Sequence, residues 1–390
     1  MINRNFAENL LVLYFLSLLA NRFYIDIGFA LSFAYFFLAI ILVFLIIQFR
    51  RAVVSTDVIT ISVAIFYLFA CFTGLYSINL DSSLRFLFGA ILLFVSTIAA
   101  SSFSISNKVS LDKVLNKLVR IYLLISLFSL VYGLVIFNAK MEHHTFGGLL
   151  VEKSVPRLVG LTIDPNFAAL TYIFCFFYLL SLTPNTSFRK SLILISFILT
   201  IATLSRSAML ALFLGVLVYV FMRMKYILKY SYYTVFGIGL LTPLVIYLDS
   251  LGVLNILDIV EKRTSGLTTG AGRFELWANA LELFSIKPLL GHGIFSFRHV
   301  NMLNFGVDRY AHNTFLEVLV ETGVVGFVLF MLIQFSILFK AYYSGRRGFL
   351  YPFYISFFIM SFSLSLYLNS IFIFVIIIFI LLTNRFVSRS

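Results

Sequence analysis

The sequence has few charged residues for its length. The 390-residue chain holds 29 Lys and Arg and 16 Asp and Glu, so that charged residues make up only 12% of it. Hydrophobic residues make up 61%, and the mean hydropathy is +1.04. A soluble domain of this size does not need so much apolar surface, and ordinary globular proteins are about 25% charged. The composition therefore excludes an ordinary soluble enzyme and indicates a membrane protein.

Cysteine and the common cofactor motifs are also scarce. Cys71 and Cys175 both lie within apolar runs, so we expect neither a disulfide framework nor a cysteine-based metal site. We find no zinc motif, no P-loop, no G-x-G-x-x-G and no Asp-x-Asp pair, which gives metal, ATP and dinucleotide dependence no support. We expect no cofactor. No linker or internal repeat interrupts the chain, which predicts a single membrane domain over residues 1–390.

Long apolar runs recur along the chain. Runs of about 20 apolar residues are typical of transmembrane helices, and strands of an outer-membrane barrel would alternate instead. The predicted fold is an all-α polytopic membrane protein with about twelve spans. The N-terminal run lacks a convincing cleavage site and is counted as the first span. The predicted cores are 9–21, 27–48, 58–77, 86–105, 117–137, 166–182, 190–204, 207–222, 231–249, 313–339, 349–367 and 370–384.

The positive charge is unevenly distributed over the predicted connections. If the N-terminus is cytoplasmic, the inner segments hold more than half of the 29 basic residues and only three acids, Glu8, Asp57 and Asp112. An excess of Lys and Arg marks cytoplasmic loops. Both termini are therefore predicted to be cytoplasmic. Most of the net charge of +13 is then a signal of topology, and a nucleic-acid partner is not needed to explain it.

Two predicted outer segments are longer than simple connections require. The first runs over residues 138–165, and the second runs over residues 250–312, which is too long for a passive loop. Within the second, GRFELWANALELFS has helical spacing of apolar residues and is followed by Pro288. We expect this large outer loop to carry amphipathic helices at the membrane surface. The apolar positions with this spacing are Phe274, Trp277, Ala278 and Leu281.

The notable polar motifs are all predicted on the outer side. Because these segments face one compartment, their side chains could meet in one site. The motifs are RLVGLTIDPN (157–166), TLSRSA (203–208), TTGAGRFELW (268–277), KPLLGHG (287–293) and AHNTFLE (311–317).

Two arginines in these motifs are candidates for binding an anion. Arg206 lies between two apolar runs, where an arginine is costly and usually has a partner; alternatively, it extends from a helix end to the interface. Arg273 follows Gly-Ala-Gly at the start of the predicted amphipathic helix, or is an ordinary surface arginine. Two guanidinium groups facing one compartment can bind a phosphate or diphosphate. Arg157 is a third candidate.

A histidine precedes the tenth predicted span. Thr314 and Glu317 have the T-x-x-E spacing of a capping box, which predicts that this span begins at or near Thr314. His312 would then lie just outside the first turn. A neutral imidazole at that position can accept a proton from a hydroxyl group. The alternative is an interfacial histidine without a role.

Three further polar residues are candidates for lining the same site. Glu321 lies one helical turn beyond Glu317 and is too deep for a cap, so we expect it to orient His312 or a bound sugar. Asn313 has no evident structural role in the sequence pattern. Asp164 lies in an Asp-Pro-Asn turn that opens the sixth span, and it is a candidate for lining the site.

The ordered set of motifs resembles a known family. The order G…DPN, LSRSA, GRxxxW, PLLGHG and AHNxxLExxxxxGxxG is similar to that of the bacterial O-antigen ligase and Wzy-type polysaccharide polymerase family. His312 and Asn313 precede Gly323 and Gly326 at the interval of that family. The resemblance covers residues 157–326.

The resemblance implies a membrane glycosyltransferase of the GT-C type in the bacterial inner membrane. Such an enzyme takes a glycan from undecaprenyl diphosphate on the periplasmic side and joins it to an acceptor sugar, with inversion and without a metal. Arg206 and Arg273, with Arg157 as the weaker candidate, would bind the diphosphate, and His312 would activate the acceptor hydroxyl. The implied partners are undecaprenyl-diphosphate-linked oligosaccharide as donor and acceptor, membrane lipid, and optionally a chain-length regulator protein.

Two alternatives stay open at this point. A polymerase joins one lipid-linked glycan to another, whereas a ligase joins it to lipid A core; we expect the polymerase, and no residue decides between them. A flippase or transporter of lipid-linked oligosaccharide is the alternative from another class. Transporters usually show internal repeats and polar groups near the middle of the membrane. This sequence has no clear repeat, and its polar motifs gather on one side.

Overall fold

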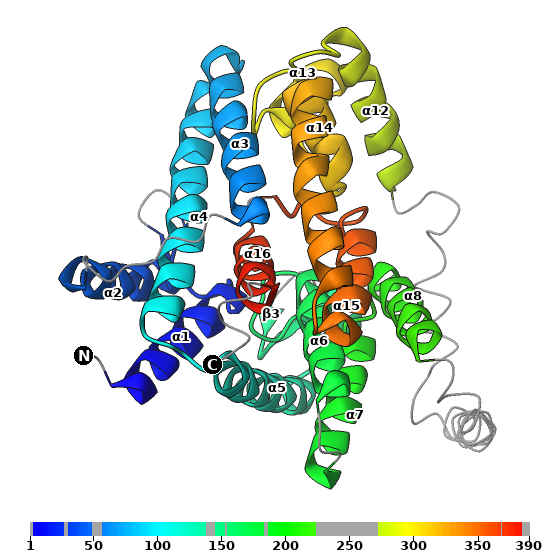
Figure 1. Cartoon of the computed structure of the whole chain (residues 1–390). Helices are drawn as coiled ribbons and strands as arrows, with labels where there is room; N and C mark the ends of the chain where they lie inside the picture. Colours follow the sequence, from blue (N-terminus) through cyan, green and yellow to red (C-terminus); the bar gives the residue numbers. More distant parts are fainter. Residues whose placement is uncertain are drawn as a thin grey trace.

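The computed structural model describes residues 3–26, 30–48, 57–137, 145–152, 154–182, 186–223, 272–367 and 369–383. Most of them are helical (Figure 1), as predicted. Each predicted span has a helix at its position except 231–249, which lies outside the described residues. The helices are α1 (Arg4–Leu19), α2 (Phe33–Ile47), α3 (Val58–Thr73), α4 (Leu80–Ser106), α5 (Leu111–Val135), α6 (Pro165–Ser181), α7 (Ser187–Ala202), α8 (Arg206–Met222), α12 (Arg273–Ile286), α13 (Phe297–Phe305), α14 (Thr314–Tyr343), α15 (Arg347–Met360) and α16 (Ser370–Thr383).

Four described helices are long and apolar enough to cross a membrane. They are α3 with the short 3-10 helix η2 (Gly74–Tyr76) that extends it, α4, α5 and α14. The shorter apolar helices are α2, α6, α8 and α16. The described residues thus form a helical, multi-pass type of membrane protein. The number of twelve spans and the GT-C architecture stay predictions.

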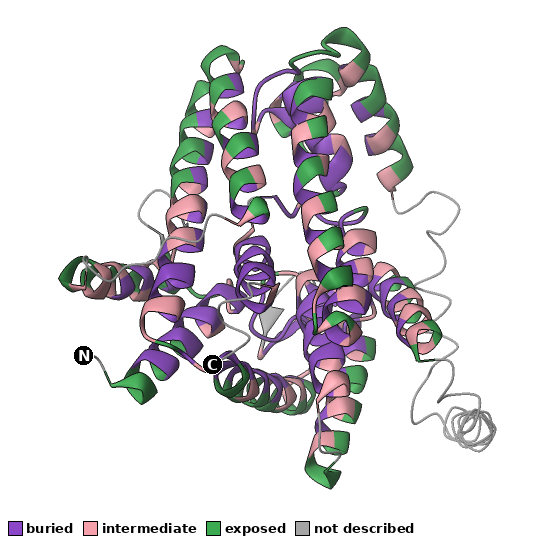
Figure 2. Cartoon of the chain, viewed as in Figure 1, coloured by how far each residue is buried: buried purple, intermediate pink, exposed green. Residues whose placement is uncertain are grey.

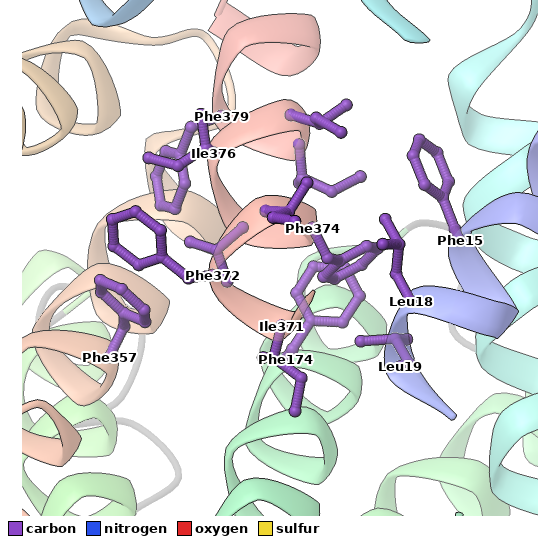
Figure 3. Close-up of a cluster of buried hydrophobic side chains, with 14 of the residues drawn as sticks. Phe15, Leu18, Leu19, Phe174, Phe357, Ile371, Phe372, Phe374, Ile376 and Phe379 are labelled. Carbon is purple, nitrogen blue, oxygen red and sulfur yellow. The ribbon is translucent and has the colours of Figure 1, made fainter. Parts of the chain in front are cut away.

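Helix α16 forms the centre of the fold. All its residues from 371 to 382 are buried, as expected for a helix that is apolar on every side, and Figure 2 shows it surrounded by the other helices. Phe374 packs edge-on against Phe15 of α1 and Phe174 of α6, with ring centroids 5.6 and 5.0 Å apart. Figure 3 shows Phe357 of α15 facing the same helix. This aromatic contact fixes α1, α6 and α15 around α16.

The segments predicted to be cytoplasmic contact one another. Lys340 at the end of α14 forms an ion pair of 2.7 Å with Asp57, the N-cap of α3. Arg346 binds Asp112 at the start of α5 through two hydrogen bonds of 2.6 and 3.0 Å. Glu8 of α1 accepts a hydrogen bond from the backbone N–H just before α5. These contacts support the predicted alternation of inner and outer connections; which side is cytoplasmic stays a prediction.

The first long outer segment contains a small antiparallel sheet where we expected a loop. Its strands are ordered β3-β4-β5, and residues 138–144 lie outside the described part. Gly147 and Gly148 join β3 to β4 with φ values of 51° and 88°, the two positive angles that a tight hairpin turn needs and glycine supplies. The strands are β3 (Thr145–Phe146), β4 (Leu149–Glu152) and β5 (Val155–Leu158), and a second hairpin before α2 pairs β1 (Tyr24–Asp26) with β2 (Ala30–Ser32).

Helix α14 is interrupted at Gly323, although the sequence predicts one continuous span. Gly323 has φ 64° and ψ −169°, a conformation almost confined to glycine. A Cβ atom there would lie 2.2 Å from the carbonyl oxygen of Leu289. Residues 288–293 bridge the interruption: the N–H of His292 donates to α14, and the N–H of Val324 donates to this segment, both at 2.9 Å. The KPLLGHG and ETGVVG motifs therefore form one packed unit.

Helix α12 covers the sequence that was predicted to be helical and ends before Pro288. Its inner face, with Leu276 and Leu283 buried, packs against α13 and α14. Phe274 and Leu281 from the predicted apolar stripe lie on the other face and are 54% and 55% exposed. An exposed apolar face fits the predicted position at a membrane surface.

We expect Gly323→Ala to lower the stability of the protein by at least about 2 kcal/mol, because the new Cβ meets backbone atoms and the φ/ψ pair is strained. Thermal unfolding of the detergent-solubilised protein measures this. The matched control is Gly89→Ala in α4, where a Cβ meets nothing within 4 Å and alanine favours a helix by about 1 kcal/mol. Equal melting temperatures for the two variants would contradict the assigned role of Gly323.

Candidate functional site

Helices α6 and α8 begin beside each other. Asp164 is the N-cap of α6 and accepts the N–H of Asn166 at 2.7 Å. Ser205 is the N-cap of α8, and its hydroxyl donates to the side-chain oxygen of Asn166 at 2.6 Å. Short polar side chains at these positions satisfy backbone N–H groups that have no partner within the helix. The DPN and LSRSA motifs thus place Asp164 and Arg206 at two neighbouring helix N-termini.

The small sheet brings a second arginine to the same turn. Arg157 on β5 is buried, and its Nε donates to the carbonyl of Thr203 in the turn between α7 and α8 at 3.1 Å. Its Nη1 forms an ion pair of 2.8 Å with Glu152. The third arginine that the sequence predicted therefore lies beside the start of α8, and β3-β4-β5 has the role of positioning it.

Arg273 is the first residue of α12 and interacts electrostatically with Asp164, Arg206 and Arg157. Burial lowers the pKa of its guanidinium; the charge of Asp164 raises it, and the charges of Arg206 and Arg157 lower it further. Residues from four separate elements are therefore close enough to interact electrostatically. The structure brings together the three arginines and the aspartate that the sequence predicted.

His312 lies between α13 and α14, outside the predicted span. Its φ of 49° is in the left-handed region, which few residues other than glycine adopt. Its backbone N–H donates to Glu317 Oε1 at 3.1 Å, and its side chain is exposed. Partial burial lowers the pKa of the imidazole, as do the charges of Arg273 and Arg309, whereas Asp164 opposes them. The imidazole is therefore neutral near pH 7 and lies beside the arginines.

The start of α14 differs in one detail from the predicted capping box. The helix begins at Thr314 as predicted, but the N-cap is Asn313, whose side chain accepts the N–H groups of Phe315 and Leu316 at 3.1 and 3.2 Å. Thr314 instead donates its hydroxyl to the carbonyl of Leu364. Asn313 is buried, and capping gives a structural reason for its presence. Its predicted role toward a substrate stays a prediction.

Glu321 has partners other than the one we expected. Its Oε1 accepts the N–H of Phe297 at 3.0 Å, and its Oε2 accepts the N–H of Phe295 and the hydroxyl of Tyr367 at 2.9 and 2.6 Å. Because Glu321 lies one turn deeper than Glu317, its carboxylate meets the loop before α13. Among the described contacts, Glu317 and not Glu321 holds His312.

The sequence analysis missed the segment that supports both glutamates. The predicted span 349–367 ends early, because α15 stops at Met360 and residues 361–367 are not helical. Ser365 donates to Glu317 Oε1 at 2.6 Å, and Tyr367 donates to Glu321. The signal in the sequence was the alternation of serine in SFSLSLYL, which does not favour a continuous membrane helix.

His292 in the KPLLGHG motif has a structural role. It is buried, and one ring nitrogen lies 2.8 Å from the carbonyl oxygen of Leu283 at the end of α12. Burial also lowers the pKa of its imidazole. In the part of the chain that the structure describes, no group of three His, Cys, Asp or Glu side chains could hold a metal ion. His312 is therefore the described histidine that combines exposure with nearby arginines.

The candidate site residues stand at or next to the N-termini of four helices, α6, α8, α12 and α14. The N-terminus of a helix carries a partial positive charge and favours anions, and the side chains of Asp164, Ser205 and Asn313 already cap α6, α8 and α14. Together with Arg157, Arg206 and Arg273, these ends can bind a ligand with several negative charges. His312 provides a neutral base at the edge of the same site.

Comparison with known proteins finds a family match over part of the chain. Residues 191–331 match the family model for O-antigen ligase, and this segment contains Arg206, Arg273 and His312. The predicted resemblance to the O-antigen ligase family is confirmed. Arg157 and Asp164 precede the matched O-antigen ligase segment, and the hydrogen bond between Ser205 and Asn166 joins their part of the chain to it.

Three relatives are similar over different parts of the chain. A putative polysaccharide ligase of Rickettsia felis is 23% identical over 296 residues, which cover 72% of this chain and 68% of the relative. A putative polysaccharide ligase of Rickettsia conorii is 24% identical over 283 residues, 69% of this chain and 64% of the relative. An uncharacterised protein of Haemophilus influenzae is 36% identical over 91 residues, 20% of this chain and 22% of the relative. The chain thus spans about two thirds of the length of the two Rickettsia relatives.

Two substitutions should move the pH dependence of activity in opposite directions if neutral His312 is the base. Arg309→Gln removes a charge that lowers the pKa of His312, so the acid limb of kcat/KM should move to higher pH. Asp164→Asn removes a charge that raises this pKa, so the acid limb should move to lower pH, and asparagine still caps α6. A pH profile of each variant measures this; shifts of the same sign would contradict the assignment.

Proposed function

We propose that this protein is a membrane glycosyltransferase that takes a glycan from a polyprenyl-diphosphate carrier and joins it to a hydroxyl group of an acceptor sugar. The observation that carries the proposal is that the charges of Arg157, Arg206 and Asp164 all act on Arg273, while Glu152 pairs with Arg157. Three guanidinium groups with two acidic neighbours leave a surplus of positive charge, which favours the binding of an anion. A diphosphate has the charge and the oxygen geometry to bind several guanidinium groups at once.

The reaction needs a base and a stabilised leaving group. His312 accepts the proton of the acceptor hydroxyl, and the acceptor oxygen forms a bond to the anomeric carbon of the donor sugar. The bond between that carbon and the diphosphate oxygen breaks, and its electron pair stays on the diphosphate. The arginines and helix N-termini stabilise the charge that develops there, so no general acid is required. A single displacement of this kind inverts the configuration.

The acceptor has two candidates. From the sequence we expected a polymerase that joins one lipid-linked glycan to another. The two Rickettsia relatives are named putative polysaccharide ligases, and the matching family model is O-antigen ligase. These names do not distinguish a ligase that joins the glycan to lipid A core from a polymerase. No contact between described residues distinguishes these two acceptors.

The proposed location is the periplasmic side of the bacterial inner membrane. The support is the excess of Lys and Arg in the segments predicted to lie on the cytoplasmic side. These segments contact one another through ion pairs such as Lys340 with Asp57 and Arg346 with Asp112. A lipid-linked oligosaccharide flippase would also bind a diphosphate, but it would have no use for a neutral base beside it. The first experiment below separates these functions.

His312→Ala should abolish glycan transfer while the protein still reaches the membrane, because the acceptor hydroxyl loses its base. The variant is placed in a strain that lacks the native protein, and its lipid-linked and lipopolysaccharide-linked glycans are analysed. Lipid-linked donor should accumulate outside the cytoplasm. A flippase would leave the donor inside, and normal glycan transfer would exclude His312 as the base.

The same analysis identifies the acceptor. Bare lipid A core together with lipid-linked polymer indicates that a ligase is missing. Core that bears a single repeat unit indicates that a polymerase is missing.

Substitutions at the two ends of α8 test whether Arg206 binds the donor. Arg206→Gln should weaken donor binding by about 10- to 100-fold, since a charged hydrogen bond contributes about 1.5–3 kcal/mol. The matched control is Arg223→Gln at the other end of α8, where the guanidinium lies over the ring of Tyr219. The KM for the lipid-linked donor is measured for both. An equal KM in the two variants would remove Arg206 from the diphosphate site.

A further inference from the structure

A pocket of about 420 Å³ lies outside the arginine site. It is formed by the start of α4, the helix α13 and the segment that leads to His312. None of Arg157, Arg206 or Arg273 lines it, and neither the sequence motifs nor the proposed reaction uses it. The lining residues on which the argument depends are Ser82, Arg85, Phe295, Arg298, Asp308 and Tyr310.

The pocket carries one cation that is not neutralised. Arg298 binds Asp308 through two hydrogen bonds of 2.5 Å and lies over the ring of Tyr310, 5.8 Å from its centre. Arg85 of α4 is exposed and has no hydrogen bond or ion pair with any described residue. Two arginines face one carboxylate, so a negatively charged group can bind at Arg85 without displacing an internal partner.

Aromatic rings form the other part of the wall. The rings of Phe295 and Tyr310 lie 6.1 Å apart and are tilted by 42°. The hydroxyl of Ser82 and the guanidinium of Arg85 provide hydrogen-bonding groups at the same pocket. Binding sites for small polar ligands commonly combine apolar and aromatic walls with a few fixed polar groups. A sugar ring, with apolar C–H faces and polar edges, fits this combination.

Helix α14 fixes the pocket next to the candidate base. Glu317 accepts the backbone N–H of His312, and Glu321 accepts the backbone N–H of Phe295 in the pocket wall. Side chains four residues apart on a helix lie on one face, about 5–6 Å from each other. Tyr310 is also only two residues from His312, at most about 7 Å along the chain. One helix face thus holds both the pocket wall and the base.

We propose that this pocket binds a sugar residue of the acceptor glycan that carries a carboxylate or a phosphate, with Arg85 as its counter-ion. The proposal rests on the proposed function and names the acceptor side of the same reaction. The arginines at α8 and α12 hold the donor diphosphate, and the pocket holds the acceptor so that its hydroxyl reaches His312. The two substrates therefore approach the base from separate binding sites.

Ligand binding to the purified full-length protein tests this independently of transfer. Saturation-transfer NMR is recorded with glucuronate, glucose 6-phosphate, glucose and inorganic phosphate as probes. Glucuronate or glucose 6-phosphate should bind more strongly than glucose, and Arg85→Gln should weaken that binding about 10-fold. Arg85→Lys should retain part of it. His312→Ala should bind the probes like the native protein even though it transfers no glycan, so a failed transfer reaction does not decide the outcome.

Two results would overturn the proposal. In the first, glucose binds as strongly as the charged sugars, or Arg85→Gln leaves their binding unchanged. In the second, glucuronate does not bind, and inorganic phosphate binds as strongly as glucose 6-phosphate. The pocket would then be a simple anion site. In a transfer assay, Arg85→Gln should raise the KM for the acceptor and leave the KM for the donor unchanged, whereas a rise in donor KM like that of Arg206→Gln would place Arg85 in the donor site.

Discussion

The repulsion among three arginines is the constraint on which this structure depends. Arg157, Arg206 and Arg273 come from a strand and two helices. The charges of Arg157, Arg206 and Asp164 all act on Arg273, and Glu152 pairs with Arg157. With Glu152 and Asp164 as acidic neighbours, the three arginines keep a surplus of positive charge that a bound anion would offset. The rest of the fold holds the cluster in place: the sheet positions Arg157, the N-cap of α8 is tied to α6, and α16 packs α6 against α1.

Helix α14 has a second role, because it organises both sides of the proposed reaction. Its interruption at Gly323 is closed by residues 288–293, which also lead into the wall of the pocket. Glu317 and Glu321 are buried above this interruption, and each binds a different loop. These carboxylates act as structural clamps, and the chemistry belongs to His312, which they help to position. Removing the loops from α14 would separate the base from both binding sites.

The sequence predicted those parts of the molecule that depend on local patterns. Hydropathy located the helices, and the motifs identified the arginines, Asp164 and His312, which the structure then brings together. It did not predict the break at Gly323, because hydropathy averaged over the whole span stays high across ETGVVG and only the contact of Gly323 with Leu289 shows the interruption. Asn313 and Thr314 both can cap a helix, and tertiary contacts with Leu364 decide which one does. The early end of α15 was also not predicted, because hydropathy averages over about 20 residues and the serines of residues 361–367 lower that average too little.

The most direct test of the central claim is a binding titration of the His312→Ala protein, which removes turnover. Undecaprenyl diphosphate and undecaprenyl monophosphate are compared by isothermal titration in detergent, with a variant that also carries Arg206→Gln and Arg273→Gln as reference. A diphosphate site built from these arginines predicts tighter binding of the diphosphate than of the monophosphate, with the preference lost in the reference variant. Equal affinity for both lipids, or a preference that survives the loss of both arginines, would contradict it.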